Sequence, residues 1–145
     1  LRPGEEMFPA EPKARARTIW FKEFGDTIVQ PAGQKIFFNR VVAKAMKFPQ
    51  NLAAADEAEA EEMPRIYDYL EGVLPDSGWL VEDRFTLADL AAACPIINLG
   101  YCSDQLATGR WPKVAAWIEA VKAWPSVAEA LVLEAPIVEG MIAKN

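Results

Sequence analysis

Residues 85–97 read FTLADLAAACPII, a nearly continuous apolar stretch that contains one carboxylate, Asp89. A helix that is apolar on every side has no face to offer to water, so it is expected to be buried. We therefore predict a helix over residues 87–100, interrupted by Pro95, at the centre of the domain. A lone carboxylate is costly to bury. The question is therefore whether Asp89 has a structural role or a catalytic one.

Thr86 and Asp89 have the spacing of a capping box, with Asp89 in the place that Glu or Gln usually fills. In such a box the Thr86 hydroxyl accepts a hydrogen bond from the Asp89 amide, and the Asp89 carboxylate accepts one from the Thr86 amide. Phe85 and Leu90 stand at the two positions of a hydrophobic staple. We predict that Asp89 is a structural cap whose loss costs ~1–3 kcal/mol. The alternative role, a general acid or base, conflicts with a carboxylate occupied by backbone amides.

Helical periodicity dominates the first fifty residues. A helix is predicted from about Lys13 to about Gln30, followed by Pro31, which should kink or end it. The apolar stripe of this helix comprises Ala16, Ile19, Trp20, Phe24 and Ile28. Residues 34–47 contain β-branched and aromatic side chains that permit a strand. The length of this segment and the helices around it nevertheless favour a helical continuation.

A second long helix is predicted from about Leu52 to Leu74, bent at Pro64. The sequence PDSGW over residues 75–79 is typical of a turn.

The remaining sequence predicts two more helices after the buried one. Residues 109–124 are amphipathic, with Pro112 in the first turn. Ser126 and Glu129 have capping-box spacing at the start of a last helix. No alternating strand pattern persists along the chain. The fold class we predict is all-α, a helical bundle of five to seven helices.

The chain contains no histidine, which excludes histidine-based zinc sites and catalytic triads. Cys94 and Cys102 would lie ~12 Å apart along one helix, too far for a disulfide. Unpaired cysteines are typical of a reducing compartment, so we expect a cytoplasmic protein. The acidic run over residues 56–62 is interpreted as a solvated helix face, and no metal site is predicted.

The net charge of −6 bears on the partners of the chain. An acidic chain without a basic stripe is not expected to bind nucleic acid. No apolar run reaches the ~18 residues that span a membrane, so no membrane association is expected.

Three segments resemble one protein family, the cytosolic glutathione S-transferases. The sequence GWLVEDRFTLADLAAACPI, residues 78–96, resembles the turn and buried central helix of their C-terminal domain. Residues 110–131 look like the following segment of that domain, with its aromatic-Pro start and Pro-Ser helix break. Residues 11–32 resemble the first helix of that domain. The three segments occur in the family's order.

The resemblance implies a two-domain protein. Residues 1–12 are then a linker from an N-terminal thioredoxin-like domain missing from this sequence, and residues 13–145 are the helical domain. Glutathione would be a co-substrate bound mainly by the missing domain, which also carries the family's catalytic residue. No catalytic residue is therefore assigned here, and the chain alone is expected to be inactive.

The resemblance also implies that this domain supplies an apolar wall for a hydrophobic electrophile and part of the interface of a homodimer. The candidate substrate-binding residues are Trp20, Phe24, Phe38 and Tyr101, for each of which core packing is the alternative. Arg15 and Arg17 are either solvated charges, the reading we prefer, or contacts to an anionic ligand.

For association, the residues we single out are Phe37, Phe38 and Met46, which lie in the least regularly patterned segment.

A second function class stays open. Helical domains of this type also occur as non-catalytic assembly modules, for example in translation-factor and tRNA-synthetase complexes. A thioredoxin-like sequence upstream of this chain would favour the transferase, and a synthetase domain or a start codon there would favour the module.

Overall fold

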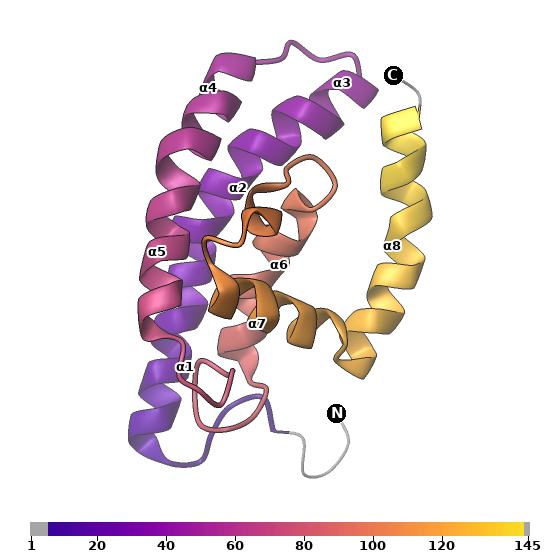
Figure 1. Cartoon of the computed structure of the whole chain (residues 1–145). Coiled ribbons are helices and arrows are strands. Elements are labelled where there is room, and N and C mark those ends of the chain that lie inside the picture. The colour runs from indigo at the N-terminus through magenta and orange to yellow at the C-terminus, as the bar shows by residue number, and fades with distance from the viewer. Residues whose placement is uncertain (1–5, 144–145) are drawn as a thin grey trace.

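A computed structural model describes residues 6–143, and the described part of the chain contains helices, turns and loops but no strand (Figure 1). The all-α prediction is confirmed. In chain order the elements are α1 (Pro12–Phe24), η1 (Gly25–Val29), α2 (Gln30–Phe37), η2 (Phe38–Val42), α3 (Ala43–Ala45), α4 (Leu52–Glu57), η3 (Ala58–Glu62), α5 (Met63–Val73), α6 (Leu87–Leu99), η4 (Gln105–Thr108), α7 (Pro112–Lys122) and α8 (Pro125–Ala143).

The segment from α1 to α3 is one continuous helical rod that contains two π-helical turns, η1 and η2. The Glu11 carboxylate caps its start, accepting hydrogen bonds from the amides of Lys13 at 3.0 Å and Ala14 at 2.6 Å. The helix does not end at Pro31. The amide of Gln30 already bonds to the carbonyl of Gly25, five residues earlier, so the missing N–H of Pro31 falls where the hydrogen-bond pattern changes register.

The face of this rod that meets the core differs from the predicted stripe. Phe21, Val29 and Ile36 are buried, whereas Trp20 and Ile28 are 57% and 49% exposed. Both faces carry apolar side chains at helical spacing, and periodicity alone does not say which of two apolar faces packs inward.

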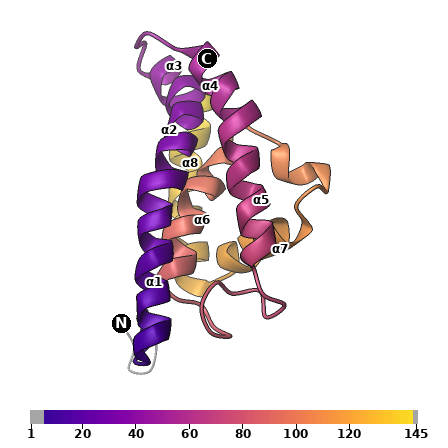
Figure 2. The ribbon, with the colours of Figure 1, turned by 90° about the vertical axis from the view of Figure 1, so that its left-hand side faces the viewer.

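The segment from α4 to α5 forms a second rod beside the first (Figure 2). The Asn51 side chain caps it by accepting from the Ala54 amide at 3.1 Å. Pro64 lies near the start of α5, directly after the π-helical turn η3.

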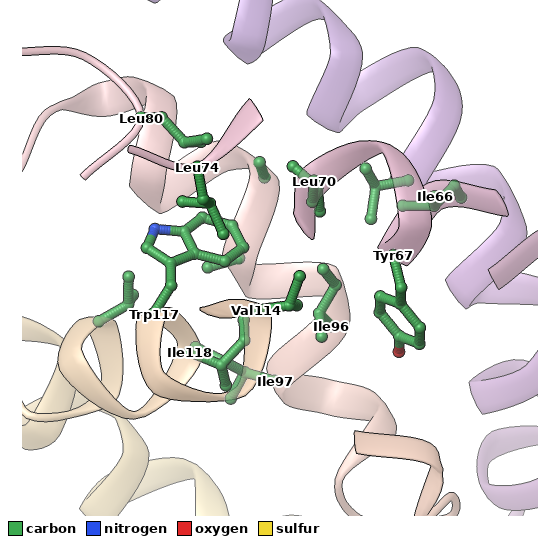
Figure 3. Packing of buried hydrophobic residues seen from close by; sticks show 14 of the residues in the cluster. Ile66, Tyr67, Leu70, Leu74, Leu80, Ile96, Ile97, Val114, Trp117 and Ile118 are labelled. Atoms are coloured by element: carbon green, nitrogen blue, oxygen red, sulfur yellow. The ribbon is translucent and has the colours of Figure 1, made fainter. Parts of the chain in front are cut away.

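Helix α6 packs against the first rod on one side and against α7 on the other. Figure 3 shows the core between these helices, where Ile96 and Ile97 of α6 approach Val114, Trp117 and Ile118 of α7. The helix is continuous through Pro95, so the predicted interruption at this residue is wrong. The prediction of a buried central helix is correct.

Helices α7 and α8 complete the bundle. The Glu71 carboxylate of α5 accepts hydrogen bonds from the first amides of α7, those of Lys113 at 3.0 Å and Val114 at 2.9 Å. Helix α8 begins at Pro125, so Ser126 lies inside the helix and the prediction that it is the N-cap is wrong. Helix α8 buries Val127 and Val138 while much of its apolar surface stays exposed.

Candidate functional site

Asp89 lies at the centre of a hydrogen-bond network that joins three parts of the chain. Its Oδ2 accepts hydrogen bonds from the amide and the hydroxyl of Thr86 at 2.9 and 3.0 Å, within a reciprocal capping box. Its Oδ1 accepts from the Leu80 amide at 2.9 Å and from the Trp117 indole at 3.0 Å. The side chain is completely buried. The carboxylate therefore holds the turn before α6 and helix α7 as well as the cap of α6.

The environment of Asp89 is that of a structural carboxylate. Burial raises the pKa of this carboxyl, and the hydrogen bonds from Leu80, Thr86 and Trp117 counteract the rise. Amide and indole N–H groups only donate, so they favour the unprotonated form. Both Asp89 oxygens are occupied by these bonds, so the carboxylate offers no free oxygen to a bound molecule.

The candidate binding site is a cavity of about 200 Å³ where the first rod meets α6. We call it the α2/α6 cavity. Its lining residues are Gln30, Gly33, Gln34, Phe37, Phe38, Val42, Pro95 and Asn98. The walls are aromatic and aliphatic, and the polar groups are three side-chain carboxamides. This composition, apolar walls with a few polar groups, is typical of sites for small organic molecules.

The two helices that line this cavity pack against each other at Gly33 and Pro95. A Cβ atom added at Gly33 would lie 3.5 Å from the Pro95 carbonyl oxygen and 3.6 Å from the Pro95 Cβ. Helices α2 and α6 therefore approach closely at this point.

The four predicted substrate-binding residues lie in three places. Phe38 lines the α2/α6 cavity. Trp20 lies on the outer face of α1 beside Tyr69 of α5. Phe24 is half-buried and packs against the core, with its ring centroid 5.1 Å from that of Tyr69. Tyr101 is half-buried in the turn after α6 and does not line the α2/α6 cavity.

Sequence reasoning missed the carboxamides of Gln30, Gln34 and Asn98. Gln30 and Gln34 are four residues apart, and Phe37 follows three residues later, which places all three on one face of the helix. This spacing is the sequence pattern from which the two glutamines could have been predicted to line one site. Asn98 enters the site only through packing of α6 against the rod.

The two arginines proposed for an anionic ligand contact the protein itself. Arg17 Nε donates to the Leu80 carbonyl at 3.2 Å, and its guanidinium lies 5.4 Å from the Phe21 ring centroid. The guanidinium of Arg15 lies 5.2 Å from the Phe8 ring.

The acidic run 56–62 forms ion pairs between the rods. Arg40 contacts Asp56 at 2.8 Å and Glu59 at 2.5 Å, and Lys35 contacts Glu62 at 2.6 Å. The bond from Arg40 is the largest contribution to a lowered pKa of Glu59. In the described part of the chain, no group of three or more cysteine, aspartate or glutamate side chains is arranged to hold a metal ion.

The cysteines are free thiols without an activating environment. Burial raises the pKa of Cys102 to about 11, and it also raises the pKa of Cys94. A thiol in this range is almost entirely protonated near neutral pH and is a weak nucleophile. Among residues 6–143, no helix is long and apolar enough to cross a membrane.

Comparison with known proteins connects this geometry to a family. The family model described as "Glutathione S-transferase, C-terminal domain" matches residues 27–125. The chain belongs to this family. The matched region contains the capping box, the α2/α6 cavity and helix α7.

Two curated relatives and one solved structure illustrate the likeness. A glutathione S-transferase of Hyoscyamus muticus is 31% identical over 130 residues, which cover 88% of this chain and 60% of that protein. Elongation factor 1-gamma of Homo sapiens is 30% identical over 97 residues, 66% of this chain and 21% of that protein. The Ure2p5 structure from Phanerochaete chrysosporium, cocrystallized with 1-(S-glutathionyl)-2,4-dinitrobenzene, aligns with a TM-score of 0.78 at 22% identity, covering 96% of this chain and 64% of that one.

Proposed function

We propose that this chain is the electrophile-binding domain of a glutathione S-transferase. The observation that carries the proposal is the α2/α6 cavity, a recess within a domain of this family whose lining combines Phe37, Phe38, Val42 and Pro95 with three carboxamides. Glutathione is the co-substrate in this proposal, and a hydrophobic small molecule is the second substrate. The role of the cavity is to position that molecule for attack by the glutathione thiolate.

The activation of glutathione belongs to a part of the protein outside this chain. Among the described residues, the cavity lining contains no ionisable side chain and no hydroxyl, and burial raises the pKa of both cysteines, which disfavours their thiolates. We propose that a thioredoxin-like domain precedes residues 1–12, which act as the linker. The greater length of the relatives, of which the chain spans 60% in the Hyoscyamus protein, supports this arrangement. We place the protein in the cytoplasm, because free cysteines suit a reducing compartment.

The test compares the full-length protein with the 145-residue chain, using glutathione and 1-chloro-2,4-dinitrobenzene. We expect glutathione-dependent turnover by the full-length protein and none above the solution rate by the chain. Phe38→Ala in the full-length protein should raise KM for the electrophile several-fold without changing KM for glutathione. Ile137→Ala on the exposed face of α8 is the control and should change neither. Turnover by the chain alone would contradict the proposal.

The family is typically dimeric, and we propose a homodimer that uses an exposed surface on the two rods. We call this surface the α1/α5 patch; it comprises Ile19, Trp20 and Ile28 of the first rod and Tyr69 of α5. These side chains are between 39% and 57% exposed, unusually high for large apolar residues at neighbouring positions. Phe38 and Met46, singled out earlier, are also exposed, whereas Phe37 is packed against the core.

A non-catalytic assembly module is the second candidate. It is favoured by the 30% identity to elongation factor 1-gamma, a protein of which this chain covers 21%. Inactivity of both the full-length protein and the chain in the assay above would favour this function.

A further inference from the structure

A second cavity lies where α5, the end of α6, η4 and α7 meet. We call it the α5/α7 cavity, and no described residue lines both it and the α2/α6 cavity. Its volume is about 170 Å³. A cavity of about 150 Å³ in a protein interior is sufficient for a benzene molecule. The α5/α7 cavity therefore has room for one six-membered ring or an aliphatic chain of similar size.

Aliphatic side chains form much of the wall of this cavity. Ile96, Ile97 and Leu99 of α6 and Ile118 of α7 are buried, and Leu106 of η4 is half-buried beside them. Figure 3 shows Ile97 and Ile118 meeting between the two helices. Such a wall favours the apolar body of a ligand, because binding removes the surface of that body from water.

The η4 side of the cavity is held in place by Glu59 of η3. The Ser103 hydroxyl donates to the Glu59 carboxylate at 2.5 Å, and the Gln105 side chain donates to the Glu59 carbonyl. Arg40 of the first rod contacts the same carboxylate at 2.5 Å. The loop between α6 and η4 is therefore tied to both rods, so this wall of the cavity is formed before a ligand binds.

The Tyr67 hydroxyl is a polar group at this cavity without a partner in the protein. Tyr67 lines the cavity and is only 2% exposed, and its hydroxyl makes no hydrogen bond within the described part of the chain. The ring packs against Trp111 with the centroids 5.0 Å apart, and in Figure 3 the hydroxyl is directed away from Ile66 and Leu70. Because nearly all buried polar groups in proteins have a hydrogen-bond partner, we expect a molecule in the cavity to supply this one.

The hydroxyl of Tyr67 acts as a hydrogen-bond donor. Burial raises the pKa of Tyr67, and the negative charge of Glu59 raises it further. The hydroxyl therefore keeps its proton near neutral pH, and its natural partner is an oxygen that accepts a hydrogen bond. An accepting oxygen at the inner end of a ligand would remove the cost of leaving this group unpaired.

The charged residues at the cavity disfavour an anion. Glu119 and Lys122 of α7 pair with each other at 2.8 Å, and Asp104, the other charged residue of the lining, is exposed. These three residues together carry one net negative charge. A carboxylate ligand would lose hydration and meet this charge, whereas an uncharged molecule avoids both costs.

From these observations we propose that the α5/α7 cavity is a second binding site, for a small uncharged molecule with an aliphatic body and one oxygen that accepts a hydrogen bond from Tyr67. Ketones and alcohols share this chemistry. The ligand does not need to be an electrophile, and the site does not depend on the proposed function of the α2/α6 cavity.

The experiment titrates four six-membered rings into the 145-residue chain and its Tyr67→Phe variant, followed by NMR. Cyclohexanone and cyclohexanol carry an accepting oxygen, methylenecyclohexane has the shape of cyclohexanone without it, and cyclohexanecarboxylate is anionic. Tyr67→Phe should weaken the binding of cyclohexanone about fivefold, the effect of about one net hydrogen bond, while methylenecyclohexane binds at least as tightly as before. Each ring is compared with itself, so differences in hydration between the rings cancel.

The other two rings define the chemical class of the ligand. Cyclohexanecarboxylate should bind more weakly than cyclohexanone. Weakening of both cyclohexanone and cyclohexanol by Tyr67→Phe assigns the site to accepting oxygens in general, and weakening of cyclohexanone alone assigns it to carbonyl compounds.

Two controls locate the effect. Tyr69→Phe removes an exposed hydroxyl two residues later on α5 and should leave the affinity for every ring unchanged. Tyr67→Phe should not lower the melting temperature, because the hydroxyl has no partner in the described part of the chain. The methyl signals of Leu106 and Ile118 should shift on titration, and the side-chain amide signals of Asn98 in the α2/α6 cavity should not.

Four results would overturn the inference. They are the absence of binding by cyclohexanone, an equal effect of Tyr67→Phe on cyclohexanone and methylenecyclohexane, a lower melting temperature of Tyr67→Phe, and signal shifts confined to the α2/α6 cavity. Binding of cyclohexanecarboxylate as tight as that of cyclohexanone would likewise contradict the preference for an uncharged ligand.

Discussion

At the scale of the residue, Asp89 does more than close a capping box. Its two oxygens accept bonds from the Thr86 amide and hydroxyl, the Leu80 amide and the Trp117 indole, all within 3.0 Å. The three N–H groups are buried as well, so water cannot replace Asp89 as their hydrogen-bond acceptor. The stabilisation therefore comes from preventing several unpaired donors at once.

We predict that Asp89→Ala destabilises the chain by at least about 3 kcal/mol, because each of three buried donors left unpaired costs about 1–3 kcal/mol. This exceeds the cost expected of a cap alone. Urea denaturation followed by circular dichroism measures the change. Asp83→Ala, at an exposed carboxylate six residues earlier, is the control and should change stability by less than about 0.5 kcal/mol. A loss of activity in the full-length protein at unchanged stability would instead give Asp89 a chemical role.

At the scale of the element, the contact between the first rod and α6 depends on two glycines and a proline. Pro95 has no N–H to offer the Ala91 carbonyl four residues earlier, and Gly25 lies against that carbonyl. A Cβ added at Gly25 would lie 2.6 Å from the Ala91 oxygen, which belongs to the backbone and has no room to move. Gly33, farther along the same face, has space for a Cβ at ordinary contact distances.

The two glycines therefore predict opposite outcomes. Gly25→Ala should destabilise the chain by about 1–3 kcal/mol, because the rod and α6 must separate. Gly33→Ala should stabilise it by up to about 1 kcal/mol, because alanine favours the helix and meets no clash. Melting temperatures of both variants check the pair. Equal changes for the two would contradict the packing described here.

At the scale of the whole molecule, the described part of the bundle leaves several apolar side chains outside its own core. Two groups of them form the α1/α5 patch and the outer face of α8, where Val132 and Leu133 are 72% and 75% exposed. A bundle that buried both surfaces would need further helices, so these faces are free for contacts with other domains or copies.

We predict that introducing charge into the α1/α5 patch prevents dimerisation. Trp20→Glu with Ile28→Glu should shift the full-length protein from dimer to monomer in sedimentation velocity, because a buried carboxylate has no partner there. Val132→Glu with Leu133→Glu on α8 is the matched control and should leave the dimer intact. Dissociation by the control alone, or a persistent dimer in the patch variant, would contradict the assigned interface.

The sequence by itself determined the features that depend on local spacing. The apolar stretch 85–97 predicts a buried helix, and the Thr86–Asp89 spacing predicts its cap, because both are properties of one helix and its first turn. The helical class and the long second helix follow for the same reason. Only the tertiary structure decided which apolar face of α1 packs inward, since the stripes through Trp20 and through Phe21 have equivalent periodicity. It alone brought Trp117 to Asp89, 28 positions away, and placed Asn98 in the same cavity lining as Gln34, 64 positions away. Such proximities depend on how the helices pack and leave no periodic signal in the chain.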